Sequence, residues 1–239
     1  MEKLNYFLCT LILLLLTNYL AVAQSDFELP NEKKQSETIK IVKMAKNLVN
    51  FGQRNANPYA MVAAAQILMD FEVDDANSGK VEKMPAKTGI SEHTTKGEGL
   101  KPIALNSTVI LKEAQLYANR NTSIMEVIND LIEKANRGSR GYSYGKGFIK
   151  VYETIPAYSS RDFKWVFEGD EFAEILFVGD DDTDINVHIY NVEDGTLLAK
   201  DESHESGAYF SWTPSSTTKY TFRITNTGAY DNTVYILSN

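Results

Sequence analysis

The sequence is poor in the residues that most often carry thiol, redox or zinc chemistry. Cysteine occurs once among 239 residues, as Cys9. If residues 1–23 are removed as a signal peptide, the remaining chain has no thiol, which excludes thiolate catalysis, disulfide exchange and cysteine-based zinc sites. The three histidines, His93, His188 and His204, are far apart and form no H-E-x-x-H pattern. A G-x-S-x-G nucleophile elbow is also missing, so we expect a protein that is not an enzyme.

Basic residues are scarce in the second half of the chain. Residues 24–140 contain 16 Lys and Arg against 15 Asp and Glu, whereas residues 141–239 contain 7 against 16. The formal charge of −8 therefore arises from the second half. Phosphate recognition needs clustered Lys and Arg, so nucleic acid is excluded as a partner. The acidic surface is compatible with a cation site or with solubility alone.

The first residues have the pattern of an export signal. An apolar run covers residues 6–16, and Ala21-Val22-Ala23 provides a small-residue cleavage site before Gln24. The alternative is an uncleaved membrane anchor, but the run is short for a span. The sequence predicts a secreted or periplasmic protein with no stable membrane span after cleavage.

Helical signals occupy the first half after a short linker at 24–35. Asn57-Pro58 is a helix start, Asn106 is a candidate cap, and Ser123 with Glu126 has capping-box spacing. We expect a small helical domain over 36–137, built as two helix pairs and interrupted by a long mobile loop at 72–103.

The hydrophobic period changes from helical to two after a Gly-rich linker at 138–147. About eight short strands separated by turns, with no helices between them, favour an antiparallel sandwich or jelly roll over 148–239. The fold class is therefore α+β in two domains. The expected strands are 148–154, 161–167, 171–178, 185–190, 196–200, 208–212, 220–226 and 233–237.

An acidic stretch, Gly-Asp-Asp-Asp-Thr-Asp, begins at Gly179 and leads into one of these strands. In extended backbone, the carboxylates of Asp180, Asp182 and Asp184 project to one side, and Asn186 continues the series. Oxygen ligands at this density suit Ca²⁺, so these four residues are the predicted calcium site. The alternative is a solvated acidic turn whose aspartates accept backbone N–H groups.

Aromatic residues on the strands offer a second candidate site. Trp212, close to Pro214 at a strand end, and Tyr209 are the predicted ligand-stacking residues. The alternative is that these rings lie in the core, as we expect for Trp165, which alternates with Phe163 and Phe167. Exposure distinguishes the two interpretations.

Several motifs lie between Phe163 and the end of the chain: Gly179 to Asn186, Asp194-Gly195, Trp212-Thr213-Pro214, the strand 220–224, Asn226-Thr227-Gly228 and Tyr235-Ile236-Leu237. Together these motifs, which cover about a third of the chain, resemble those of the bacterial pre-peptidase C-terminal domain family. Asn186 and Asn191 stand where that family often has aspartate. The resemblance implies a β-sandwich of jelly-roll type that acts as a binding module without catalysis, here beside a helical region and no protease domain.

These observations predict a non-catalytic secreted or periplasmic binding protein, with calcium as its only candidate cofactor. Its ligand would be an unidentified protein or glycan. The alternative is an accessory or inhibitor-like partner of an exported enzyme, which would contact that enzyme through the helical domain.

Overall fold

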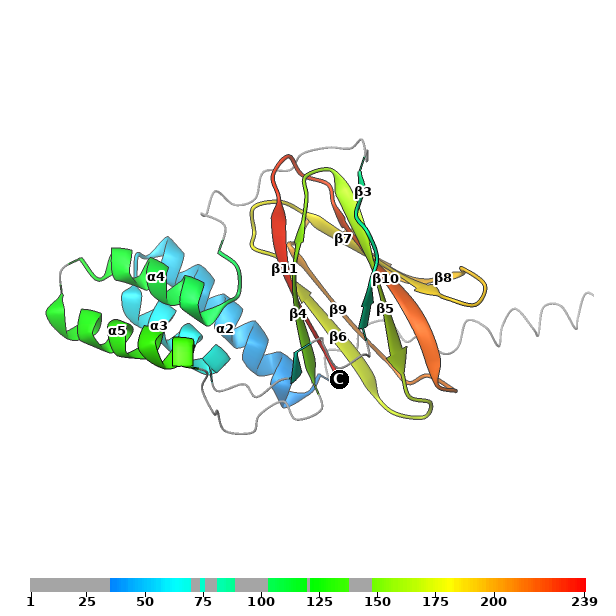
Figure 1. Ribbon diagram of the computed structural model, residues 1–239, viewed down its shortest axis with the longest axis horizontal. Coiled ribbons are helices and arrows are strands. Elements are labelled where there is room, and N and C mark those ends of the chain that lie inside the picture. Colours follow the sequence, from blue (N-terminus) through cyan, green and yellow to red (C-terminus); the bar gives the residue numbers. More distant parts are fainter. Residues whose placement is uncertain (1–34, 70–73, 76–80, 89–102, 120, 138–147) are drawn as a thin grey trace, which may run out of the picture.

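A computed structural model describes residues 35–69, 74–75, 81–88, 103–119, 121–137 and 148–239. These residues form four helices in the first half, followed by two largely antiparallel β-sheets that pack face to face (Figure 1). The predicted α+β class is therefore confirmed. The predicted signal peptide and the predicted Gly-rich linker lie outside the described residues. No helix in the described ranges is long and apolar enough to cross a membrane.

Asparagine and serine side chains start the helices, which are α2 (Glu37–Arg54), α3 (Pro58–Met69), α4 (Ser107–Tyr117) and α5 (Thr122–Arg137). The Asn106 carboxamide oxygen accepts the amides of Thr108 and Val109, as the sequence predicts. Asn57 accepts two amides of α3 in the same way. The predicted capping box at Ser123 is wrong, because α5 begins at Thr122 and the Asn121 side chain accepts the amide of Ile124.

All eight expected sandwich strands are present, with ends that differ from the prediction by at most two residues. They are β4 (Ile149–Ile155), β5 (Ser159–Phe167), β6 (Ala173–Val178), β7 (Ile185–Asn191), β8 (Leu197–Asp201), β9 (Gly207–Trp212), β10 (Thr218–Asn226) and β11 (Asn232–Ser238).

The strand order is that of a jelly roll. One sheet has the order β4-β11-β6-β9 and the other the order β5-β10-β7-β8, so most connections cross between sheets and only β7–β8 is a hairpin. We call these the helix-side sheet and the far-side sheet. Eight strands nested in two four-stranded sheets are the jelly-roll arrangement.

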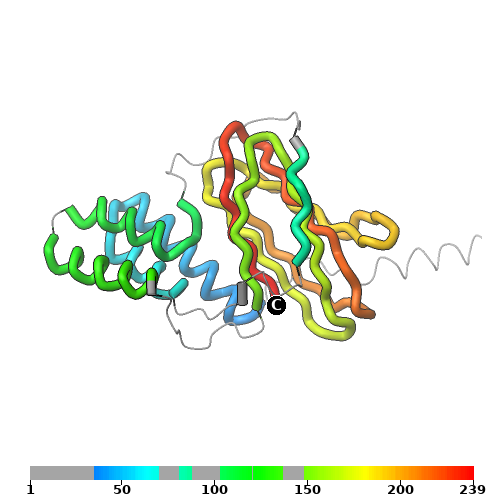
Figure 2. Tube along the Cα trace, in the orientation of Figure 1, coloured from blue at the N-terminus to red at the C-terminus, as the bar shows by residue number. Residues whose placement is uncertain are grey.

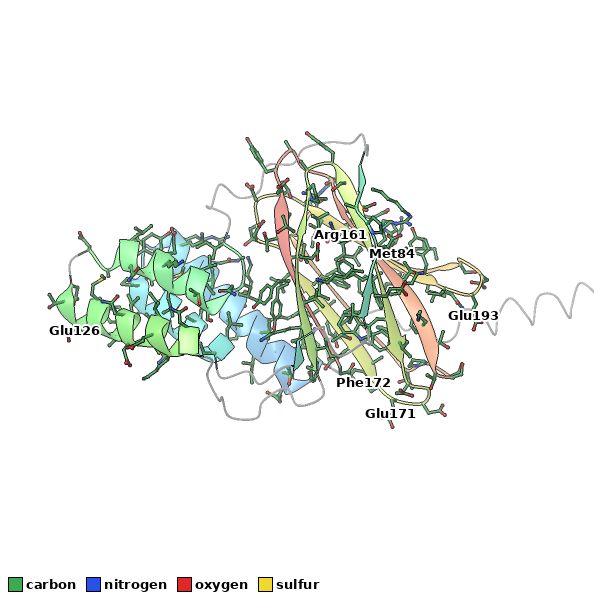
Figure 3. All side chains as sticks on the ribbon, viewed as in Figure 1. Met84, Glu126, Arg161, Glu171, Phe172 and Glu193 are labelled. Carbon is green, nitrogen blue, oxygen red and sulfur yellow. The ribbon has the colours of Figure 1, made fainter. Side chains whose placement is uncertain are left out.

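Three short strands extend the edges of both sheets, and all come from the segment 72–103 that the sequence predicts as a loop. β1 (Asp74–Asp75) pairs parallel to β4, and β2 (Val81–Lys83) and β3 (Lys87–Thr88) pair antiparallel to β5. Figure 2 shows the segment around β2 and β3 running beside β5. Met84 and Arg161 are labelled near this edge in Figure 3. The sequence lacks a clear signal for these strands because they are short and have little alternation.

Two buried clusters organise the interior. One fills the space between the two sheets, where side chains meet in Figure 3, and includes Phe163, Trp165 and Phe222. The second joins the helices to the outer face of the helix-side sheet. It contains helical residues such as Ile39 and Val42 together with sheet residues Leu176, Val178, Tyr209, Tyr235 and Leu237. The helices therefore cover one outer face of the sandwich.

Candidate functional site

The acidic stretch forms a turn rather than a continuous strand. Asp181 has a left-handed backbone with φ of 69°, a conformation that aspartate tolerates better than most residues. Gly179 packs so closely that a Cβ there would meet the side chains of Ser206 and Asn232. The backbone from Asp180 to Asp182 is therefore not the extended strand from which the calcium site was predicted.

The Asp180 carboxylate is used inside the protein. It is buried, and its two oxygens accept the amides of Asp182 at 3.2 Å and Thr233 at 2.7 Å. Burial raises the pKa of Asp180, and the two backbone hydrogen bonds only partly oppose that shift. Asp180 therefore joins this turn to β11, which is the behaviour expected of an aspartate in a structured turn.

The Asp181 carboxylate connects α2 to the sandwich through an ion pair. Lys46 of α2 reaches this carboxylate at 2.6 Å and also donates to the carbonyl of Gly179 at 3.2 Å. At the N-terminal end of α2, the amide of its cap residue Ser36 and the Tyr209 hydroxyl of β9 donate to the buried Glu174 carboxylate at 3.1 and 3.0 Å. One face of α2 thus makes polar contacts at two places on the helix-side sheet.

Asp184 and Asn186 differ from Asp180, because each has a buried side-chain oxygen without a hydrogen-bond donor among the described residues. The Asp184 side chain is 9% exposed, and its second oxygen lies 4.0 Å from His204 Nδ1. Burial raises the pKa of Asp184, His204 opposes the shift and Asp201 adds to it. Among the described residues, no three His, Cys, Asp or Glu side chains gather as a metal site. The calcium prediction is not tested by these observations.

A buried amide network holds the acidic turn in place. Thr183 donates to Asn226 Oδ1 at 2.8 Å, and Asn232 Nδ2 donates to the carbonyl of Thr183 at 2.9 Å. Asn226 Nδ2 in turn donates to the carbonyls of Ile155 at 3.0 Å and Tyr230 at 2.7 Å. Asn226 and Asn232 are fully buried, so this network sets the geometry of three connections at one end of the sandwich.

The predicted ligand-stacking residues are in the interior. Trp212 is 3% exposed and packs edge-on against Phe167 in the core between the sheets. Tyr209 is 7% exposed and lies under α2, where the Lys43 ammonium is 4.8 Å from its ring centroid. Neither ring has a free face for a ligand, because strand alternation directs both toward packed neighbours. Trp165, expected to be buried, is 1% exposed.

A different surface is open in the described part of the chain: the outer face of the far-side sheet. Its inward positions, including Phe222 and Val187, are core residues, so the alternate positions of the same strands face outward. We define the far face by eight outward residues: Lys164, Val166, His188, Tyr190, Lys200, Lys219, Thr221 and Arg223. The helices lie on the opposite side of the sandwich (Figure 1).

Arg223 is the centre of this face. Its Nε and Nη2 donate to the two Asp162 oxygens at 2.7 and 2.8 Å, and its guanidinium lies 5.3 Å from the Tyr190 ring centroid. Strand register places Arg223 opposite Asp162 on β5 and opposite His188 on β7. The His188 and Tyr190 rings are nearly parallel, with centroids 6.2 Å apart.

Ion pairs order the rest of the far face. Glu202 accepts from His188 at 2.9 Å and also pairs with Lys200. Lys219 lies 3.7 Å from Glu82 of β2. Sequence analysis did not propose these residues as a site. The alternation of core and polar residues in 185–190 and 220–226 predicts that the residues of β7 and β10 face outward, but not that four strands bring the far face together.

No family model and no curated protein matches the chain. Among solved structures, a periplasmic inhibitor of g-type lysozyme from Aeromonas hydrophila is similar over 41% of this chain and 90% of its own, with TM-score 0.30 and 8% identity. The pre-peptidase C-terminal domain of a collagenase from Bacillus anthracis is similar over 38% and 86%, with TM-score 0.28 and 12% identity.

The enzymatically active domain of tailspike protein 4 from bacteriophage CBA120 is also similar over 38% of this chain, but over only 15% of its own, with TM-score 0.26 and 8% identity. Likeness at these TM-scores and identities carries no argument about family or activity. The resemblance to the pre-peptidase C-terminal domain family therefore rests on the motifs in the sequence.

Proposed function

We propose that this protein is a non-catalytic, exported binding protein whose ligand docks on the far face. The observation that carries the proposal is the asymmetry of the sandwich. Apolar residues and α2 cover the outer face of the helix-side sheet, whereas the far face presents Arg223, Tyr190 and three lysines. A face with ordered cations and aromatic side chains is suited to recognition.

The environments of the acidic residues support a role without catalysis. Asp180 accepts two backbone amides, and Asp181 is paired with Lys46, so neither carboxylate is available as a nucleophile or base. Export is proposed from the first 23 residues, which have the signal-peptide pattern.

A steric block tests the far face without changing its charge. Thr221 lies between Lys164 and Tyr190 in the strand register, so Thr221→Tyr would cover the centre of the face with a residue that strands accept. Thr154→Tyr on β4 is the matched control, since Thr154 is exposed on the other sheet. Wild type and both variants would be applied to immobilised polysaccharides and extracellular matrix proteins.

The proposal predicts that Thr221→Tyr loses a binding signal that Thr154→Tyr retains. If every ligand bound by the wild type is bound equally by Thr221→Tyr, the far face is not the binding surface.

Calcium-dependent binding is a second candidate, and the unpartnered oxygens of Asp184 and Asn186 favour it. Both are hard oxygen donors of the kind that Ca²⁺ prefers. Asp180 fits less well, because both of its oxygens already accept backbone amides. We therefore propose that any calcium affinity depends on Asp184 and Asn186, which lie at one end of the far-side sheet.

Inhibition of an exported enzyme through the helices is the remaining alternative, and exposed apolar residues on the helices favour it. Phe51 is 52% exposed, Tyr59 60% and Leu116 68%. Leu116→Ser should abolish enzyme binding in this alternative and should leave far-face binding unchanged.

A further inference from the structure

The far face carries more positive than negative charge, although the second half of the chain, which forms most of it, is acidic overall. Of the seven Lys and Arg after residue 140, four lie on this face: Lys164, Lys200, Lys219 and Arg223. Of the sixteen acidic residues in the same half, Asp162 lies within the face and Glu202 at its edge, while most others lie on connections between strands. At the β5 edge of this face, Glu82 of β2 adds one negative charge and Lys87 of β3 adds one positive charge. The positive charges of the face therefore still exceed its negative charges.

Arg223 is held ready to bind an anion. Asp162 uses two of its five N–H donors, and the Tyr190 ring lies beside the guanidinium plane. The side chain is 34% exposed, so donors remain available to a ligand while the conformation is already fixed. An ordered guanidinium loses less entropy on binding than a free one, which favours carboxylate, sulfate or phosphate recognition.

The other cations are spread over the sheet rather than gathered in one pocket. Lys200 is opposite His188, which is opposite Arg223, so the two cations are two strands apart, about 10 Å. Lys219 lies opposite Val166 and Lys164 opposite Thr221, which extends the positive charge along β10 and β5. A single small anion would contact one of these groups, whereas a chain with regularly repeated charges would contact several at once.

We infer that the far face binds an acidic polysaccharide, with Arg223, Lys164, Lys200 and Lys219 contacting successive anionic groups. The inference rests on the proposed function and adds the class of ligand. Charge complementarity favours a polyanion as the ligand of this positive face. The rings of Tyr190 and His188 favour sugars, whose apolar ring faces pack on aromatic side chains. β5, β10 and β7 are each paired on both sides, so a peptide strand could add only at the β8 edge and not across the centre of the face.

Charge reversal on exposed residues tests the inference. The test variant is Lys164→Glu with Lys219→Glu, and the matched control is Lys112→Glu with Lys134→Glu on the exposed surfaces of α4 and α5. Binding of the chain from Gln24 onward to polygalacturonate, heparin, neutral dextran and poly-L-glutamate would be measured by titration calorimetry at low and high salt.

The expected result is binding to polygalacturonate or heparin that weakens with salt, is about tenfold weaker in the test variant and is unchanged in the control. Binding to poly-L-glutamate or dextran in preference to both acidic polysaccharides would overturn the ligand class. If Thr221→Tyr still abolishes that binding, the proposed function survives. Acidic-polysaccharide binding that is equally strong in the test and control variants would overturn the inference. Thermal unfolding of both variants checks that each is folded.

Discussion

Asn226→Asp should be one of the most damaging isosteric changes in this protein. The substitution keeps the shape of the side chain and replaces its NH₂ group by an oxygen. In the native structure, that NH₂ group donates to the carbonyls of Ile155 at 3.0 Å, Pro156 at 3.3 Å and Tyr230 at 2.7 Å. Asn226 is 0% exposed, so water cannot replace the lost donor.

The magnitude follows from the unsatisfied carbonyls. A buried acceptor left without its donor costs about 1–3 kcal/mol, and a buried charge facing it costs more. We expect the variant to lose about 4 kcal/mol of unfolding free energy and about 10 °C in Tm, since each kcal/mol shifts a domain of this size by about 2–4 °C. Thermal and denaturant unfolding of the chain from Gln24 would measure both quantities.

The loss should also depend on pH. Burial against carbonyl oxygens would raise the pKa of the introduced carboxyl in the folded state above its unfolded value, so the folded state holds the proton more tightly. The deficit relative to wild type should be smallest below about pH 4, the unfolded pKa, and should grow as pH rises toward the folded pKa.

Asn191→Asp is the matched control. The Asn191 side chain accepts the Glu193 amide at 2.8 Å, an acceptor role that aspartate performs equally well, so this variant should stay within about 0.5 kcal/mol of wild type. If Asn226→Asp has the same Tm as Asn191→Asp and wild type, the amide network does not hold the connections together and the reasoning is refuted.

Three further predictions concern calcium at Asp184, the ion pair of Asp162 with Arg223 and the ion pair of Lys46 with Asp181. Millimolar calcium should raise Tm relative to EDTA, by the equivalent of about 2.7 kcal/mol at 100 times Kd, and Asp184→Ala should abolish the increase; an unchanged Tm would favour a solvated acidic turn. Burial alone would raise the pKa of Asp162, but Arg223 and Lys87 together outweigh burial and the pKa is lowered. Stability from this pair is therefore complete above about pH 4 and lost as pH falls further, and Asp162→Asn should flatten that acid limb in denaturant unfolding; an acid limb as steep as that of wild type would contradict this. Lys46→Met should leave Asp181 unpaired and speed hydrogen exchange in α2, whereas the exposed Lys40→Met should not; equal exchange in both variants would show that the Lys46 contact does not hold the helix.

The sequence alone determined the α+β class, the eight sandwich strands and two of the helix starts. Short apolar segments between turn signals located all eight sandwich strands, and in β7 and β10, which bury one face, the buried residues repeat every second position. Asn57 and Asn106 located two helix starts, because a cap is a local interaction between a side chain and the next few amides. These features depend on neighbours in the chain, so they can be read without knowledge of the fold.

Tertiary structure decided the sites. Neighbouring aspartates of the acidic stretch contact different parts of the fold. Asp180 accepts the amide of Thr233 on β11, whereas Asp181 pairs with Lys46 on α2, and neither partner is close in sequence. Whether an aromatic ring is exposed depends on what covers its face of the sheet, and α2 covers Tyr209. The far face is assembled from residues between Lys164 and Arg223, which only the jelly-roll strand order places side by side. Long-range pairing sets these neighbours, and no local pattern in the sequence contains it.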